Sequence, residues 1–252
     1  MRRALGVLAA VGLLAANAAG SAGAGESLYR ASTVVTGRSP ESLAAGLPRC
    51  LAAVLVKVSG DPRLGSDPAA AKLAGDARAM VASATFRDRM AGIPVHDEQG
   101  SRERPHVLTV DFDPDRIDAA LEGLGRRPWP QPRPRLSMRL TVRNGDTGFA
   151  LTEDGAKGRD MREALADAAE RFGLDVELPR AEGQRDGERA GLVPLAGSLT
   201  WDPGKRGWSA DWRLEAPGGG HAWSVGGVSF DEAFRSGIGG SAQVLSGNGE
   251  PG

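Results

Sequence analysis

Apolar residues recur at helical spacing in several stretches of the chain. The clearest stretch has apolar residues at 43, 47, 50, 51, 54, 55 and 58, which places them on one face of a helix. It opens at Ser39-Pro40 and stops at Gly60, which are typical first and last residues of a helix. Pro48 lies inside it and is expected to kink or restart the helix, because proline lacks the N–H that an interior turn uses. The same spacing predicts helices over 67–84, 113–125 and 159–173, and a short last helix after a capping box at Ser229 and Glu232.

Runs of alternating or β-branched residues between these stretches predict strands. They cover 28–36, 86–95, 105–112, 136–142, 174–178, 192–201, 207–214 and 222–228. The polar residues 96–104 join two of the runs as a hairpin, and Asn144-Gly145 is a strong turn signal. Because the strands come in hairpins with helices between them, the pattern predicts an α+β fold with two small, mainly antiparallel sheets, each packed against helices.

A proline-rich segment divides this pattern into two parts. Residues 126–134 hold four prolines in nine positions, which neither a helix interior nor a central strand accommodates. We therefore predict a signal peptide over 1–24, an N-terminal α+β domain over 25–127, a proline-rich linker over 128–134, a C-terminal α+β domain over 135–246 and a disordered tail over 247–252.

The first 24 residues have the three parts of a secretory signal. Arg2 and Arg3 form a positive start, an apolar run of thirteen residues follows over 4–16, and Ala22-Gly23-Ala24 fits the A-x-A cleavage pattern. Ala16-Asn17-Ala18 is a second candidate cleavage site. An uncleaved membrane anchor is disfavoured, because a run this short does not span a bilayer comfortably. We expect cleavage, a periplasmic location and no transmembrane segment in the mature chain.

Composition narrows the classes of function. The chain is 40% apolar and 25% charged, as in globular proteins. Its formal net charge of −1 gives no basic field, so we expect no nucleic acid as a partner. Cys50 is the only cysteine, which excludes an intramolecular disulfide and a zinc ribbon. Its place on the apolar face of a predicted helix indicates a buried thiol.

One acidic run resembles a calcium-binding loop but departs from it at a decisive position. Asp111, Asp113, Asp115 and Glu122 stand at positions 1, 3, 5 and 12 of that loop, whereas Arg116 occupies position 6, where the sharp turn needs glycine. A strand end followed by a helix cap explains the same residues. We predict no metal site here.

The three histidines give no tight pattern either. His96 and His106 flank a polar loop that contains carboxylates, and His221 follows three glycines in a predicted hairpin turn. Paired imidazoles could bind zinc, but the ligand spacing of a zinc site is missing. No G-x-S-x-G is present, and the G-x-G-x-x-G match over 247–252 has no helix after it. We predict no catalytic, metal-binding or cofactor-binding residue, and no cofactor.

Tryptophan gathers in the C-terminal β-rich stretch. Trp208 and Trp212 are four residues apart and so share one face of a strand, and Trp201 and Trp223 lie on its neighbours. Indoles on one sheet face can stack on sugars or grip a peptide, which makes Trp208, Trp212 and Trp223 a candidate binding surface. The favoured alternative is a core role, which is the commoner use of so large a ring.

Several blocks together resemble a proteobacterial family of exported proteins known only as a domain of unknown function. The first are Leu28-Tyr29-Arg30-Ala31 with Val34-Val35, and the helix end VLVKVSG over 54–60. Further blocks follow in order at 108–114, 129–134, 173–179, 207–214, 223 and 231–234. Pro48 and the short 181–192 region depart from the pattern. The resemblance implies an envelope location and an α+β fold, and it implies no activity.

The sequence therefore predicts a non-catalytic, exported accessory or binding protein that acts on an envelope protein or a cell-wall component. Two alternatives stay open at this point. The first is an envelope hydrolase that uses His96, His106 or His221 with a carboxylate as its base. The second is a glycan-binding sheet with exposed tryptophans.

Overall fold

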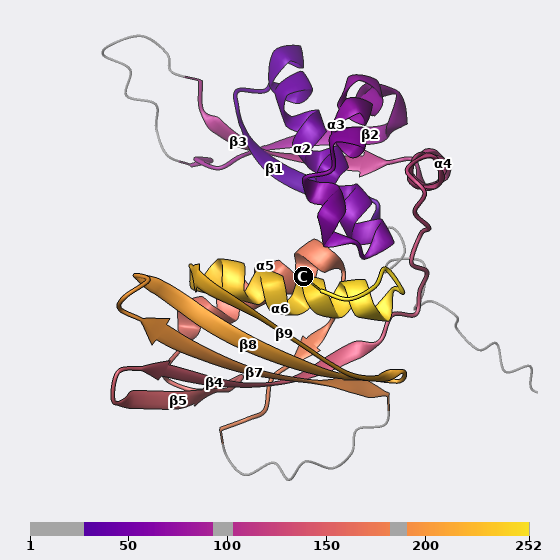
Figure 1. Cartoon of the computed structure of the whole chain (residues 1–252). Helices are drawn as coiled ribbons and strands as arrows, with labels where there is room; N and C mark the ends of the chain where they lie inside the picture. Colours follow the sequence, from indigo (N-terminus) through magenta and orange to yellow (C-terminus); the bar gives the residue numbers. More distant parts are fainter. Residues whose placement is uncertain (1–27, 93–102, 182–190, 252) are drawn as a thin grey trace, which may run out of the picture.

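The chain folds into two sheets, each with helices packed on it (Figure 1). The computed structural model describes residues 28–92, 103–181 and 191–251, so the predicted signal peptide and His96 lie outside the described residues. One sheet has three strands in the order β1-β3-β2, and the other has six, with β5-β4-β7-β8-β9 in a row and β6 beside β4. The predicted α+β fold is confirmed.

The N-terminal half is built around the antiparallel three-stranded sheet. Its elements are β1 (Arg30–Thr36), α2 (Pro40–Ser59), η1 (Pro62–Gly65), α3 (Pro68–Lys72), η2 (Leu73–Met80), β2 (Val81–Asp88), β3 (Pro105–Phe112) and α4 (Pro114–Gly123). One helix was predicted over 67–84, and that prediction is wrong: a short helix and a 3₁₀ segment end at Met80, and Val81 begins a strand. β-branched and aromatic residues from Val81 onward pair with β3, so sheet pairing overrides the local helical spacing.

Helix α2 runs unbroken through Pro48, where a kink or restart was expected. Proline removes the N–H that would bond to the carbonyl of Ala44, and Ala44 is exposed, so water can serve that carbonyl. Ser39 caps the first turn by accepting from the Ser42 amide, and Gly60 closes the last turn at a φ of 71°. By length and composition α2 could cross a membrane, but 61% of its apolar window is buried in the protein, as in a core helix.

A polar stripe on α2 occupies the outer edge of β1. Ser42, Arg49 and Lys57 donate hydrogen bonds to the carbonyls of Thr36, Val34 and Arg30, at 2.6, 3.0 and 3.1 Å. These donors are seven and eight residues apart, which is one face of a helix. The stripe takes up carbonyls with which another strand would otherwise pair.

The C-terminal half is a mixed sheet under two helices. Its elements are β4 (Arg135–Asn144), β5 (Thr147–Leu151), α5 (Arg159–Phe172), β6 (Val176–Glu177), β7 (Leu192–Asp202), β8 (Gly207–Ala216), β9 (Gly219–Val228) and α6 (Phe230–Leu245). Three of the five strand pairs are antiparallel, while β4 runs parallel to β6 and β7. The capping box at Ser229 and Glu232 is present, although the helix after it is 16 residues long rather than short.

Helix α6 lies directly on aromatic rings because three of its residues are glycines. A Cβ on Gly237 or Gly240 would come within 2.7 or 2.6 Å of the rings of Trp212 and Trp223. A Cβ on Gly239 would be 2.7 Å from the ring of Phe172 on α5. Glycine is therefore required for the helix to approach the sheet this closely.

The two halves share a buried junction centred on Arg133. Its guanidinium donates to the carbonyls of Phe172 and Gly173 at the end of α5, and to those of Val58 and Trp129, all within 3.3 Å. It also stacks 4.4 Å from the Trp129 ring centroid. The C-terminal ends of α2 and α5 carry partial negative charge, which favours this buried cation. Burial nevertheless lowers the pKa of Arg133 to about 10.

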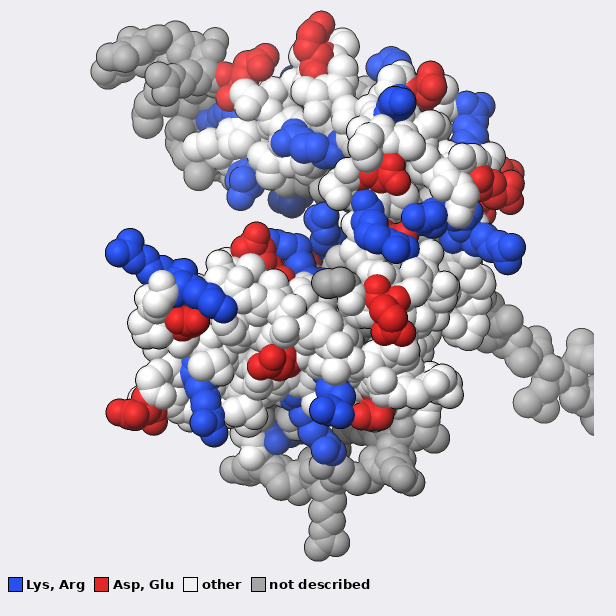
Figure 2. Space-filling model, viewed as in Figure 1, with Lys and Arg blue, Asp and Glu red and all other residues white. Residues whose placement is uncertain are grey.

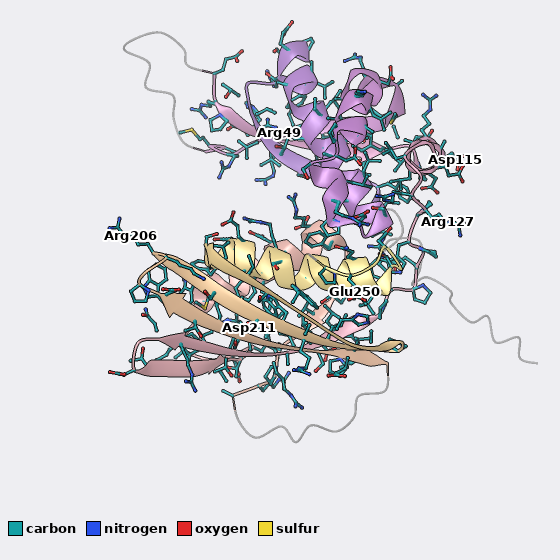
Figure 3. The ribbon with its side chains drawn as sticks, viewed as in Figure 1. Arg49, Asp115, Arg127, Arg206, Asp211 and Glu250 are labelled. Carbon is teal, nitrogen blue, oxygen red and sulfur yellow. The ribbon has the colours of Figure 1, made fainter. Side chains whose placement is uncertain are left out.

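Asp61 forms a second part of the junction and is fully buried. Its carboxylate accepts from Arg63 at 2.8 Å and from Arg126 at 2.7 Å. Figure 2 shows basic side chains gathered where the halves meet, among them Arg127, which Figure 3 labels. The two halves are thus in contact through this junction. Their division into separate domains at 25–127 and 135–246 stays a prediction. Within the segment 128–134, Arg133 is buried and the Trp129 amide donates to the carbonyl of Val58, whereas residues 130–132 are exposed.

The described part of the tail predicted over 247–252 makes hydrogen bonds with the rest of the protein. The Asn248 side chain donates to the carbonyl of Ser59 at 2.9 Å, and its own carbonyl accepts from Arg63 at 2.8 Å. Gln243 donates to the carbonyl of Glu250 at 2.6 Å. The chain end is thus held against α2 and α6 by hydrogen bonds that the residue types alone did not indicate.

Candidate functional site

A recess of about 410 Å³ lies between α5 and the chain around β6. This volume is in the range of small-ligand sites. Four of its lining residues come from one stripe of α5, and the others come from the ends of β5 and β6. They are Glu153, Arg162, Leu165, Ala166, Ala169, Val176, Glu177, Leu178 and Arg180.

The apolar residues that line the recess, called its apolar floor from here on, are Leu165, Ala166, Ala169, Val176 and Leu178. The larger share of the exposed lining is polar, and the α5 side chains Ala166 and Ala169 are small. Arg162, Leu165, Ala166 and Ala169 follow the spacing i, i+3, i+4, i+7, so they share one helix face. The adjacent face of α5 buries Ala164, Ala168 and Phe172 in the core, which fixes the orientation of the helix. The two alanines leave space where larger side chains would fill it.

On the wall opposite α5, hydrogen bonds join residues 153–154 to residues 179–181. The Glu153 amide donates to the carbonyl of Pro179 at 2.9 Å, and Arg180 donates to the Glu153 carboxylate at 3.2 Å. Next to them the Ala181 amide donates to Asp154 at 2.8 Å. That hydrogen bond is the largest cause that holds the pKa of Asp154 below its ordinary value.

The rim carries two acids and two bases. Glu153 pairs with Arg180, and Glu177 pairs with Arg135 from β4. Arg162 makes a different set of contacts: its Nη1 donates to the carbonyls of Lys157 and Thr152 at 2.8 and 3.3 Å. Arg162 therefore fixes the loop before α5 through one nitrogen only.

The described histidines lie in different halves and do not meet. His106 Nδ1 is 2.9 Å from the carbonyl of Arg104, so it carries the proton, and its ring packs edge-on against Phe86. His221 Nδ1 is 2.8 Å from the carboxylate of Glu250, which Figure 3 labels near the end of α6. Neither histidine lines the recess. The hydrolase alternative therefore gains no support from their placement.

Of the three tryptophans of the candidate binding surface, two are buried and one is half-buried. Trp212 and Trp223 are 2% and 8% exposed, because they lie beneath α6. Trp208 is half-buried and meets Trp201 edge to face at 5.5 Å. The shared face of Trp208 and Trp212 was predicted, and it is the face that packs inward.

The open face of the same sheet has a shallow hollow of about 500 Å³. Small or polar side chains such as Ala196, Ser198 and Ser224 line it. Asp211, labelled in Figure 3, also lines it and accepts a hydrogen bond from Ser198 at 3.1 Å. No side chain that is both aromatic and exposed lines the described part of this hollow.

The acids of the calcium-like run serve separate structural roles. Asp111 pairs with Arg30 and accepts from Ser83, whereas Asp113 caps α4 by accepting from the amides of Asp115 and Arg116. Across the described ranges, no group of three or more His, Cys, Asp or Glu residues is arranged to hold a metal ion.

Cys50 is 1% exposed. Burial raises the pKa of its thiol to about 11. A thiol with a raised pKa is a poor nucleophile at neutral pH.

Sequence reasoning missed the recess. Its residues are spread over 153–180, and none belongs to a motif. Two alanines and an arginine on one helix stripe were the only available signal, and such a stripe is common.

Comparison with known proteins adds one match. Residues 22–130 match the model of a family described as Domain of unknown function (DUF8605). No curated protein and no solved structure matches the chain. The matched segment spans the N-terminal half, so the recess lies outside it. The predicted resemblance to a family of unknown function is thus supported for residues 22–130.

Proposed function

We propose that this protein is an exported accessory or binding protein of the cell envelope and that the recess beside α5 is its binding site. The observation that carries the proposal is the recess itself, with an apolar floor, a charged rim and a volume of about 410 Å³. Its partner would be an envelope protein or a cell-wall component.

The lining of the recess favours binding over catalysis. Its nine described lining residues include no His, Cys, Ser, Thr or Lys. Its two carboxylates, Glu153 and Glu177, are each engaged in an ion pair with an arginine. The recess thus offers groups that bind and orient rather than groups that exchange protons.

The export part of the proposal rests on the sequence of residues 1–24. It is tested by fusing the chain to alkaline phosphatase, which is active only outside the cytoplasm. We expect activity from the complete chain, and loss of it when Leu13 and Leu14 are both replaced by arginine, because charge interrupts the apolar run. Equal activity from both fusions would contradict export through this segment.

The binding part is tested in cells with a photo-crosslinking residue at Ala166, which lines the recess; its side chain is a short aliphatic diazirine, which leaves the recess open. The matched control carries it at Asp167, which is exposed on the same helix but does not line the recess. We expect an envelope component to be captured from position 166 and not from 167. The same products from both positions, or none from 166, would contradict the assignment of the recess.

A further inference from the structure

We propose that the recess binds an apolar group that ends in a carboxylate, with Arg162 as the residue that receives the carboxylate. The inference rests on the proposed function, because it names the class of ligand for the same recess. Two sources share this chemistry. The C-terminal residue of a peptide is one that an envelope protein would supply, whereas a free fatty acid would replace the partner proposed above.

The geometry of Arg162 carries the first step. Guanidinium has five N–H donors, and the two on Nη1 are used by the carbonyls of Lys157 and Thr152. Within the described ranges, Nε and Nη2 of Arg162 have no hydrogen-bond partner, and no carboxylate lies within 4 Å of this side chain. The Nε–Nη2 edge is the fork that binds a carboxylate through two parallel hydrogen bonds.

The surrounding charges select Arg162 over Arg180, the other arginine that lines the recess, and over Arg135, which pairs with a lining carboxylate. Arg180 already pairs with Glu153, and Arg135 pairs with Glu177. Asp154 is the remaining acid nearby, but it accepts from the Ala181 amide, and Arg162 is only the last of the causes that lower its pKa. A ligand carboxylate would therefore pair with the guanidinium of Arg162, which two carbonyls hold in place and which has no acidic partner among the described residues.

The apolar floor carries the second step. Leu165, Ala166 and Ala169 line the recess on the α5 side, and Val176 and Leu178 line it on the other. An apolar chain placed between them removes its own surface and theirs from water, which is favourable in proportion to the area buried. The recess thus matches a ligand with a carboxylate at one end and carbon along the rest.

The test uses the mature chain and four small probes. N-acetyl-leucine represents a peptide C-terminus and octanoate represents a fatty acid; N-acetyl-leucinamide and octanamide are the same molecules without the charge. Binding is measured by isothermal titration calorimetry. We expect an acid to bind at least about tenfold more tightly than its amide, since hydrogen bonds to a charged group are the stronger ones. Binding of only one acid identifies the source.

Variants locate the binding. Arg162→Gln is expected to weaken acid binding about tenfold or more, whereas Arg159→Gln, which removes an exposed arginine paired with Glu163 one turn away, should leave it unchanged. Because Arg162→Gln also loosens the loop before α5, a second variant is used. Ala166→Phe fills the recess and should abolish binding, and Asp167→Phe should not.

The outcomes separate this inference from the proposed function. If neither acid binds, or if acid and amide bind equally, the ligand class is wrong, while crosslinking at Ala166 can still support the recess. If the acids bind but the chain is not exported, the envelope role fails and the ligand class stands. Binding that survives both Arg162→Gln and Ala166→Phe would overturn the inference.

Discussion

The two halves bury their sheets with different divisions of bulk. In the N-terminal half large groups come from the helix as well as the sheet: Leu51, Val54 and Leu55 of α2 are at most 1% exposed. In the C-terminal half α6 buries Phe234 and Ile238, but three glycines lie beside them, and the rings of Trp212, Trp223 and Phe172 fill the space over those glycines. Both helix–sheet layers are close-packed. Large side chains can therefore come from the helix or from the sheet, as long as together they fill the space between the two.

The junction between the halves follows a third arrangement. It is polar and buried, with Arg133 held by backbone carbonyls and Asp61 held by two arginines. Buried polar groups of this kind are costly unless their hydrogen bonds are satisfied. The junction therefore depends on geometry from both halves at once, whereas each sheet depends on its own covering helix.

The largest loss of stability is expected when a large buried side chain is truncated, either on the sheet or on the covering helix. Trp212→Ala should lower the free energy of unfolding by about 3–5 kcal/mol, and Leu55→Ala by about 2–5 kcal/mol. Each leaves a cavity, one from the sheet side and one from the helix side. Denaturant unfolding followed by circular dichroism gives both values. A loss below about 1 kcal/mol for either would contradict the assigned division of bulk.

A smaller loss of stability is expected when a side chain is added to a glycine of α6 that contacts an aromatic ring. Gly237→Ala should destabilise by about 1–3 kcal/mol, because its Cβ would be 2.7 Å from the Trp212 ring. The matched control, Gly123→Ala in α4, has open space around it and should stabilise by up to about 1 kcal/mol through helix propensity. In a Trp212→Leu background Gly237→Ala should become tolerated. Equal effects of the two glycine changes would argue against close contact at α6.

These two sites show how far the sequence reaches. The large apolar residues of α2 repeat at helical spacing, so its length and buried face were predictable. Helix α6 has the run GIGGSA in its middle, where few large residues mark a face, and it was expected to be short. The shared face of Trp208 and Trp212 followed from strand alternation, but alternation does not tell which of the two faces a helix covers.

Contacts between distant segments were the least predictable. The parallel pairing of β4 with β7 joins strands that begin at Arg135 and Leu192, and no local pattern marks a parallel partner. Arg133 looked like one more residue of a proline-rich linker. The recess likewise is assembled from separate turns and strands, so its residue types carried no signal until the fold brought them together.

A pH-dependent contribution is expected from the junction. Burial acts to raise the pKa of Asp61, but hydrogen bonds from Arg63 and Arg126 outweigh it, so the net shift is downward. Because the folded pKa is lowered, the ionised carboxylate stabilises the folded protein at pH values above its ordinary pKa of about 3.9. This contribution to stability is lost as the pH falls through the lower pKa of the folded state.

The variant Asp61→Asn should therefore flatten the loss of stability below about pH 4. Asp67→Asn, at the N-cap of α3, is the control and should leave most of the acid dependence in place. Unfolding midpoints measured from pH 2 to pH 7 compare the two. If Asp61→Asn lost stability at low pH as steeply as the unaltered protein, protonation of Asp61 would not be the cause of that loss.

The smallest effect concerns the thiol of α2. Burial raises the pKa of Cys50 to about 11, so the native protein should not react with a thiol reagent at pH 8, whereas the unfolded chain should react fully. The rate of labelling then reports opening of the N-terminal layer. Rapid labelling of the native protein would mean that α2 does not cover its sheet as described.

The most direct test of the binding site is a ¹H–¹⁵N NMR titration of the protein with N-acetyl-leucine and octanoate. The account predicts that at least one acid shifts amide signals around Arg162, Ala166 and Leu178, and that signals from the hollow around Asp211 stay in place. Shifts centred on that hollow, or none that saturate with either acid, would contradict the assignment of the recess as the site for an apolar carboxylate.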